Sequence, residues 1–470
     1  MELKIRIKNI KSIKETYLHL KRGMNILIGP NGSGKTCTLF SLKFLRDIIV
    51  YGAAQAVARG GGKKRVYHRD EIFIEFEIVH DYGLRTYRRK KVPMSFRWYI
   101  RISQGGVDNL SIVSNEIFQI FVKNNKRSIL EVEIDRNRSL AKKYNYSFCP
   151  PNDFGRDLFK IWDVVFKGED KNKISQKFNH ELTNFLDAIT KDSEQSLFSY
   201  FSSLDIEIEK VYVLLKGIDE YNIIPDIARS SVEQLPTAYM KPNGEGVADV
   251  IHSLEKKYFN KIERASLTTH GEVEFVGYRR INSLFRRPSS LYYLLSRRDG
   301  LSTALDNIQK ELAAAVSVID NVTTTIDETN GKRYVLFKSG NQVFSPEEVS
   351  DGTIKWLCIL VSIYVPISTI YLLEEPENFL HPWMQQKLIS NMREQAKEKE
   401  IIYFLTSHSA TVLNAAEPQE ILVVTSSFEK GTTVKALSNR DEIEELLESS
   451  NFRLGDLWVS GMIEGVPGNG

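Results

Sequence analysis

The sequence predicts an α/β fold, and three features of its hydrophobic pattern indicate this class. A short apolar strand at 24–29 leads through a Gly-rich turn into residues 35–52, which have helical apolar spacing. Segments between 71 and about 134 alternate with period two, as antiparallel strands do. Two further apolar strands are expected at 401–407 and 420–426. We therefore expect one α/β core whose pieces come from both ends of the chain, with the middle inserted into it.

The composition is that of an ordinary soluble protein. The chain has 470 residues, of which 42% are hydrophobic and 26% are charged, so two or three substructures are expected and global disorder is not. A net charge of +3 restricts any nucleic-acid binding to local patches. Cys37, Cys149 and Cys358 are isolated, which disfavours a zinc site or disulfides and favours a reducing, cytoplasmic location.

The remaining elements follow from the same patterns. Residues 2–9 and 15–20 alternate like half-buried strands, and the Gly-rich stretch 60–64 is expected to be a loop. The N-terminus lacks the apolar region of a signal peptide. Residues 153–210 and 245–316 are rich in helical spacing. The predicted divisions are the N-terminal part of the core, an inserted mainly helical lobe and the C-terminal part of the core, at 1–150, 151–318 and 319–470.

The C-terminal part contains a stretch that resembles a membrane span. Residues 354–373 are almost free of charge and long enough to cross a bilayer. Lys355 lies near the start of the stretch, Pro366 lies in its middle, and two acids end it. We therefore predict a buried helix, a turn and a buried strand, with no membrane span. A hairpin is expected before it at 323–337, and a helix after it near 382–398.

The turn after the first apolar strand has the sequence of a phosphate-binding loop. "GPNGSGKT" fits G-x-x-x-x-G-K-[ST] and occupies the strand–turn–helix position that this motif requires. Its glycines allow successive N–H groups to turn toward an anion at a helix N-terminus. Lys35 would reach the β and γ phosphates, and the Thr36 hydroxyl would ligate Mg²⁺. The predicted nucleotide-binding residues are Gly29, Pro30, Asn31, Gly32, Ser33, Gly34, Lys35 and Thr36.

A later apolar strand ends in two adjacent acids, Glu374 and Glu375. In nucleotide hydrolases such a strand lies beside the P-loop strand, its first acid serves the Mg²⁺ and the next can orient or deprotonate water. Glu374 is therefore the predicted metal-side acid, together with Thr36, and Glu375 is the predicted general base. Taken alone, the pair is equally consistent with surface charges at a strand end.

Two further motifs change this balance. "VSDGT" begins an apolar helix, so Ser350 and Gly352 lie at a helix N-terminus, which is another anion site. "LTSHS" places His408 just after an apolar strand. Taken alone, this histidine would be read as an incidental residue at a capped strand end.

The order of these motifs resembles that of the ABC-class ATPases. The motifs "GPNGSGKT", "SDGT", "LLEEPENFLHP" and "SHS" are similar to those of the overcoming-lysogenization-defect (OLD) and RecF-like branch of this class. That branch includes stand-alone ATPases of prokaryotic anti-phage defence systems. The resemblance covers residues 1–50 and 344–426 well, and the middle only in general layout. It implies an ABC-type P-loop ATPase head with an antiparallel β subdomain and an inserted helical lobe.

The resemblance also implies a role for each matching residue. Members of the class bind ATP between two heads, so Ser350, Asp351 and Gly352 would contact the γ-phosphate held by the partner's P-loop. Glu375 would polarise the attacking water, and His408 would sense the γ-phosphate. The implied cofactors are ATP and Mg²⁺, and the implied assembly is a homodimer, or a higher homo-oligomer, formed through the ATP sites.

Two positions depart from the family's pattern. The metal-side acid is usually Asp, and Glu374 is longer by one methylene. Either a water-mediated contact is rearranged or the metal sits slightly differently, and hydrolysis is expected to be slow. The glutamine that usually links the metal to the inserted lobe has no clear counterpart, and Gln55 is the nearest in sequence. The loop at 378–381 would pass the dimer seam.

Two basic segments, 82–91 and 277–298, combine cationic and aromatic residues. The second contains six arginines and no acid. Such segments can grip a phosphate backbone and stack on bases, although a solvated helix face or a surface for an acidic protein has the same composition. The predicted contacts to DNA or to a protein partner are Arg279, Arg280, Arg286, Arg287, Arg88 and Arg89.

The leading hypothesis is a cytoplasmic, DNA-associated ATPase whose ATP-driven dimerisation controls a separate effector, a nuclease or toxin, in phage defence or DNA repair. The chain shows no nuclease motif, and residues 426–470 are too few for a fused nuclease domain. The alternative is a non-DNA protein switch that scaffolds or restrains a toxin. A transporter subunit is disfavoured by the large insertion, and a chromosome-organising ATPase by the lack of a long heptad run.

Overall fold

Two groups of strands build the main sheet of the protein. The computed structural model describes residues 2–87, 90–105, 110–123, 127–135, 143–148, 195–202, 206–233, 238–257 and 301–463. The antiparallel group contains β1 (Leu3–Ile10), β2 (Ile13–Leu20), β4 (Phe73–Tyr87), β5 (Lys90–Gln104), β6 (Ser111–Val122), β7 (Arg127–Asp135) and β8 (Lys143–Phe148). The mainly parallel group contains β3 (Gly23–Ile28), β9 (Ile218–Tyr221), β13 (Ile370–Glu374), β14 (Ile402–Thr406), β15 (Ile421–Ser427) and the antiparallel strand β16 (Gly431–Ala436).

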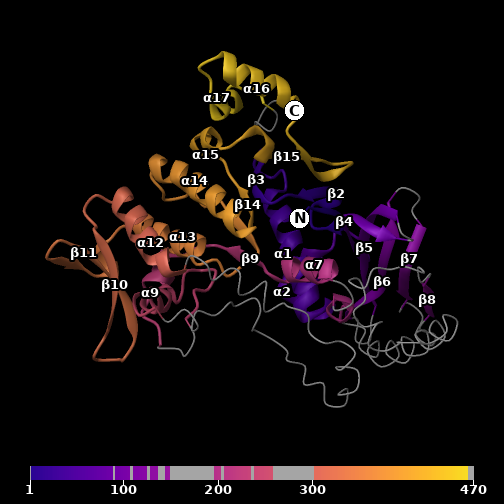
Figure 1. Ribbon diagram of the computed structural model, residues 1–470, viewed down its shortest axis with the longest axis horizontal. Helices are drawn as coiled ribbons and strands as arrows, with labels where there is room; N and C mark the ends of the chain where they lie inside the picture. Colours follow the sequence, from indigo (N-terminus) through magenta and orange to yellow (C-terminus); the bar gives the residue numbers. More distant parts are fainter. Residues whose placement is uncertain are drawn as a thin grey trace.

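All thirteen strands form one sheet in the order β8-β7-β6-β5-β4-β1-β2-β16-β15-β3-β14-β13-β9. The two groups meet where β16 pairs with β2 at Gly431 and Ile13. A separate three-stranded sheet, β10 (Asn321–Ile326), β11 (Arg333–Ser339) and β12 (Gln342–Phe344), lies at the opposite end of the molecule from β5 to β8 (Figure 1). The predicted α/β class is confirmed.

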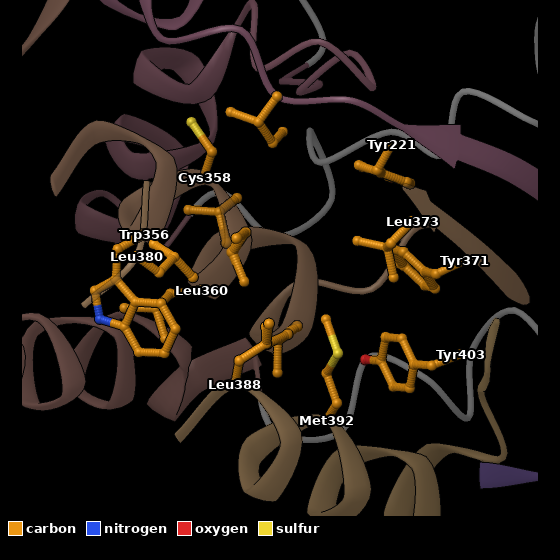
Figure 2. Packing of buried hydrophobic residues seen from close by; sticks show 14 of the residues in the cluster. Tyr221, Trp356, Cys358, Leu360, Tyr371, Leu373, Leu380, Leu388, Met392 and Tyr403 are labelled. Atoms are coloured by element: carbon orange, nitrogen blue, oxygen red, sulfur yellow. The ribbon is translucent and has the colours of Figure 1, made fainter. Parts of the chain in front are cut away.

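Helices cover both faces of the parallel group. Successive side chains along its strands point to opposite faces, and each face belongs to a separate apolar cluster. Leu372 and Phe404 belong to the cluster with α1 (Lys35–Tyr51), whereas Leu373 and Tyr403 belong to the cluster with α13 (Asp351–Tyr364) and α14 (Pro382–Lys399). Figure 2 shows Trp356 and Leu360 of α13 and Leu388 and Met392 of α14 gathered in the second cluster. A parallel sheet buried on both faces explains the near-continuous apolar runs.

The remaining described helices surround this core. They are α2 (Ala53–Arg59), α3 (Lys63–Val66), α6 (Phe198–Phe201), α7 (Ile206–Lys216), α8 (Pro225–Arg229), α9 (Val247–Glu255), α12 (Leu301–Ala315), α15 (Ala410–Ala415), α16 (Arg440–Ser449) and α17 (Leu454–Val459), with short 3-10 turns at Pro346–Glu348 and Pro418–Glu420. In the described part of the chain, none of the helices has the length and apolarity needed to cross a membrane. The apolar stretch at 354–373 is instead the buried helix and strand that the sequence predicts.

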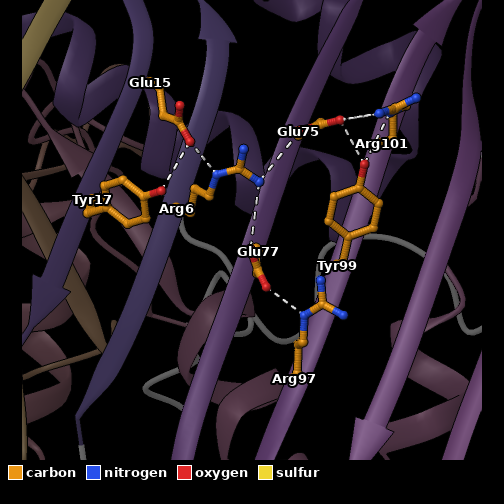
Figure 3. Close-up of polar contacts among 8 residues, drawn as sticks. All are labelled: Arg6, Glu15, Tyr17, Glu75, Glu77, Arg97, Tyr99 and Arg101. Carbon is orange, nitrogen blue, oxygen red and sulfur yellow. Dashed lines mark hydrogen bonds and ion pairs between the residues drawn. The ribbon is translucent and has the colours of Figure 1, made fainter.

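The antiparallel group has one apolar face and one polar face. On the polar face Arg6 of β1 lies between Glu15 of β2 and two acids of β4 (Figure 3). The acid Glu75 is only 6% exposed and accepts a hydrogen bond at 2.8 Å from the Tyr99 hydroxyl of β5, while Arg101 of β5 pairs with it. Opposite charges on directly opposed strands stabilise such a sheet.

Several predicted elements differ from the structure. The stretch 60–64 is only partly a loop, because α3 begins at Lys63 after the turn at Gly60–Gly62. The short elements α2, β9 and β16 carry too little periodicity to be predicted. Strand β9 comes from the range predicted as a helical lobe, yet it pairs in parallel with β13. Most of 153–210, and 258–300 within the second helix-rich range, lie outside the described residues.

Candidate nucleotide-binding site

The P-loop connects the end of β3 to the start of α1, and its glycines are required by backbone and space. Gly32 and Gly34 have φ of 78° and 101°, which L side chains rarely adopt. A Cβ on Gly34 would lie 2.1 Å from Oγ1 of Thr432, which is fully buried on β16. In the described part of the chain, the N–H groups of Gly32, Gly34, Lys35 and Thr36 donate no hydrogen bond. They form the ring of free donors that an anion needs.

Lys35 lies inside this loop. Its Nζ donates to the Gly29 carbonyl at 2.8 Å and to the Pro30 carbonyl at 3.0 Å, and the side chain is only 7% exposed. Burial lowers the pKa of Lys35, and the charges of Glu375 and Glu374 oppose this shift. The ammonium group therefore lies between the P-loop and the two acids that follow β13.

The acids lie at the P-loop, although their strand is not beside the P-loop strand. The Thr36 hydroxyl, at the start of α1, donates a hydrogen bond to the Glu374 carboxylate at the end of β13. The prediction that β13 lies next to β3 is wrong, because β14 pairs in parallel with both strands and separates them. Helix α1 contacts β13 as well as β14, and the hydrogen bond to Glu374 comes from Thr36 in its first turn.

Glu375 and His408 lie close to one another on neighbouring strand ends. Glu375 has φ of 43°, and its N–H donates to the Thr406 hydroxyl of β14 at 3.1 Å. Its carboxylate accepts a hydrogen bond from the Asn378 amide at 2.9 Å and lies 3.8 Å from Nε2 of His408. Burial and the charge of Lys35 lower the pKa of His408, and the charge of Glu375 opposes them. A neutral imidazole therefore faces an acid at neutral pH.

Glu377 is a site residue that sequence reasoning missed. It is 5% exposed and accepts hydrogen bonds from the Ser407 hydroxyl at 2.6 Å and from the His408 N–H at 3.2 Å. Burial raises the pKa of Glu377, and these hydrogen bonds oppose the rise. This carboxylate ties the loop after β13 to the loop after β14. In the sequence it was only the third acid of "EEPE".

The serine-glycine motif lies at the N-terminus of α13. The Ser350 hydroxyl caps the helix by accepting from the Thr353 N–H at 3.2 Å. A Cβ on Gly352 would lie 2.5 Å from the carbonyl of Phe379, so this turn is packed against the loop that follows the acids. Within the described residues, no hydrogen bond or ion pair joins Ser350, Asp351 or Gly352 to the P-loop.

Other predicted site residues are not part of this cluster. Gln55 is exposed on α2 and has no described hydrogen bond to the P-loop or the acids. The predicted DNA or partner contacts lie outside the described residues; they are Arg279, Arg280, Arg286, Arg287, Arg88 and Arg89.

The residues present fit a magnesium-bound triphosphate. The free N–H groups and Lys35 suit phosphate oxygens, and Thr36 and Glu374 supply the hydroxyl and carboxylate oxygens that Mg²⁺ accepts. Among the described residues, no group of three or more His, Cys, Asp or Glu side chains could hold a metal ion by itself. A magnesium ion at Thr36 would therefore draw its other ligands from phosphate and water, as it does in nucleotide enzymes.

Comparison with known proteins gives one family match, which covers part of the chain. Residues 251–414 match the domain family described as "AAA domain, putative AbiEii toxin, Type IV TA system". This match contains α13, both acids and His408, but not the P-loop. No curated protein matches the chain. The chain has a mixed α/β fold with one large sheet, and its match to this family is confined to residues 251–414.

Solved structures of SMC head domains are similar to the chain at low identity. An SmcHead bound to the C-winged helix domain of ScpA has a TM-score of 0.44 and 12% identity, over 93% of this chain and 98% of that chain. A Pyrococcus furiosus Smc head with an extended coiled coil, bound to the C-terminal domain of ScpA, gives 0.42 and 13% over 95% and 98%. The Thermotoga maritima SMC head domain gives 0.33 and 11% over 93% and 99%.

Proposed function

We propose that this chain binds ATP with Mg²⁺ at the P-loop and hydrolyses it. The observation that carries the proposal is the hydrogen bond from Thr36 to Glu374, which joins the phosphate-binding loop to an acid pair from a different strand. A phosphate-binding loop and an acid pair are expected side by side where a metal-bound phosphate lies between them.

Each side chain then has a definite task. The free N–H groups and Lys35 bind and orient the phosphates, while Mg²⁺ supplies positive charge to the phosphate oxygens when bound. Glu375 accepts the proton of the attacking water, and the Asn378 amide and the Thr406 hydroxyl hold Glu375 in place. His408 reports the γ-phosphate to the loop anchored by Glu377. Glu374 in place of the usual Asp makes hydrolysis slow.

The second half of the ATP site comes from another copy of the chain. Ser350 and Asp351 are exposed at a helix N-terminus, which is a ready anion site. Phe379, in the adjacent loop, is 71% exposed although it is a large apolar side chain. A homodimer in which this turn faces the partner's P-loop would cover Phe379 and complete both sites.

The biological role follows from the resemblance to the OLD and RecF-like branch. We propose a cytoplasmic, DNA-associated ATPase that controls a separate nuclease or toxin in phage defence or DNA repair, with DNA held by the basic segments. A second candidate, a non-DNA switch that scaffolds or restrains a protein toxin, is favoured by the matched family, whose description includes a toxin of a toxin–antitoxin system.

The test is phosphate release and molecular mass with MgATP, for wild type and for Glu375→Gln. General-base catalysis contributes about 10²–10⁴ in rate, so we expect turnover to fall by about 100-fold or more while ATP-bound dimer accumulates. Glu394→Gln, at an exposed acid of α14, is the matched control and should leave both readouts unchanged. Wild-type turnover in Glu375→Gln would overturn the base assignment.

The same measurements separate the two biological roles. A DNA-associated ATPase should change its turnover or dimer mass when double-stranded DNA is added, and this change should weaken with salt. A protein switch should be indifferent to DNA and should instead capture the product of a neighbouring gene in an ATP-dependent manner.

A further inference from the structure

Helix α8 holds one arginine against the turn that precedes α13. The Arg229 guanidinium donates from Nε to the Pro346 carbonyl at 3.0 Å and from Nη2 to the Val349 carbonyl at 2.9 Å. Nη2 also lies 2.6 Å from Oδ1 of Asp351, and Nη1 lies 3.3 Å from Oδ1 of Asp226. The Arg229 side chain is 14% exposed, so these contacts are made by a nearly buried cation.

The element that carries Arg229 is itself firmly held. Strand β9 pairs with β13, and the chain between β9 and α8 is fixed by N–H bonds from Asn222 and Ile224 to the carbonyls of Pro242 and Asn243, both at 3.0 Å. Within β9, the Glu220 carboxylate forms an ion pair with Lys43 of α1. The segment that carries Arg229 is therefore fixed to the core sheet. The planar guanidinium group has several N–H donors and contacts several acceptors at once.

The contact with Asp351 solves an electrostatic problem of the proposed site. In the nucleotide-free protein, an acid such as Asp351 in the first turn of a helix is stabilised by the helix dipole. The same carboxylate would repel a γ-phosphate brought to Ser350 and the N-terminus of α13. Arg229 pairs with the carboxylate and adds a positive charge beside the turn, while its two carbonyl contacts fix the turn's shape.

We propose that Arg229 is a positioning residue of the nucleotide site: it neutralises Asp351 beside the turn at 346–351, so that the N-terminus of α13 accepts the partner's γ-phosphate. This inference rests on the proposed ATP-driven dimer. It assigns a function to a residue outside all the sequence motifs, from the middle of the chain.

The test measures ATP-dependent dimerisation in the Glu375→Gln background, which holds ATP without turnover. Adding Arg229→Gln should weaken the dimer about tenfold, a coupling within the usual range for residues in contact. Adding Asp351→Asn to that variant should recover most of the loss, because the uncompensated charge is then removed. Arg22→Gln, at an exposed arginine that pairs with Glu400, is the control and should leave the dimer unchanged.

The effect of adding Asp351→Asn to Arg229→Gln shows whether Arg229 acts by neutralising Asp351 or only by stabilising the fold. If Arg229 only braced the fold, Asp351→Asn would not restore dimerisation, since the contacts to the two carbonyls would still be missing. That result, or equal dimerisation with and without Arg229→Gln, would overturn the inference alone. If the Glu375→Gln variant itself formed no ATP-dependent dimer, the proposed function would fail, and the inference with it.

Discussion

At the scale of single residues, His408 lies between a cation and an anion. Burial and Lys35 disfavour its protonation, whereas Glu375 favours it. Because the pKa of His408 in the folded state is below the ordinary histidine value of 6.5, the folded chain binds this proton less tightly than the unfolded chain. The associated stability is present above about pH 6.5 and is lost as the pH falls through the lowered pKa.

A proton NMR titration of His408 tests this arrangement. The pKa should lie below 6.5 in the nucleotide-free protein. Lys35→Met should raise it by removing a nearby positive charge, and Glu375→Gln should lower it by removing the negative one. His19, half-buried on β2 and paired with Glu2, lies on a different strand of the sheet and provides the internal control. A pKa of His408 that ignores both substitutions would contradict the geometry of the site.

Glu374 shows how one residue departs from the pattern its neighbours predict. The sequence marked it as an unusual metal-side acid, and in the structure its carboxylate accepts the hydrogen bond from Thr36. Its strand ends one strand away from β3, because β14 lies between them. The acid must therefore meet the P-loop at the start of α1, and the longer side chain gives it additional reach.

At the scale of elements, the β15–β16 hairpin supports the P-loop from the side. Thr432 lies on this hairpin, 0% exposed, with its hydroxyl 3.1 Å from the Ser33 carbonyl and 2.9 Å from the Ser12 hydroxyl. The same threonine occupies the space where a side chain at Gly34 would lie. The loop's shape thus depends on a hairpin about four hundred residues further along the chain.

Alanine at the two P-loop glycines separates backbone strain from packing. Gly32→Ala meets no atom within 4 Å, so it should cost only the left-handed backbone penalty of about 1–2 kcal/mol. Gly34→Ala incurs the same penalty and also meets Thr432, so its thermal midpoint without nucleotide should be clearly lower. Equal midpoints for the two variants would show that the hairpin yields and does not support the loop.

At the scale of the whole molecule, the nucleotide site is assembled from both ends of the chain. Strand β3, from the first thirty residues, lies between β14 and β15, which come from beyond residue 400. The matched domain at 251–414 therefore lacks the central strand and the P-loop of its own sheet. Neither end of the chain can form the parallel group alone.

Splitting the chain tests this dependence. Fragments 1–257 and 301–470, expressed together, should copurify, because β3 of one fragment is flanked by β14 and β15 of the other. Fragment 301–470 expressed alone should be insoluble or lack a cooperative thermal transition, since it exposes two apolar strand edges. A stable, cooperatively folding 301–470 fragment would contradict the shared sheet.

Sequence patterns alone identify the local elements and the chemical groups of the site. The motif spacing predicted the turn between β3 and α1, the helix that Ser350 caps, and the strands that end at Glu374 and before His408. These features depend on residues close in sequence, whose conformational preferences and periodicity are visible without a partner.

Which of these groups lie in contact is visible only in the folded structure. The place of β14 between β3 and β13, Arg229 beside Asp351, Thr432 against Gly34 and Glu377 beneath His408 are all contacts between distant segments. No periodicity reports such contacts, because they follow from the order in which the strands enter the sheet. For this reason the chemistry could be predicted from the sequence, and the residues that position it could not.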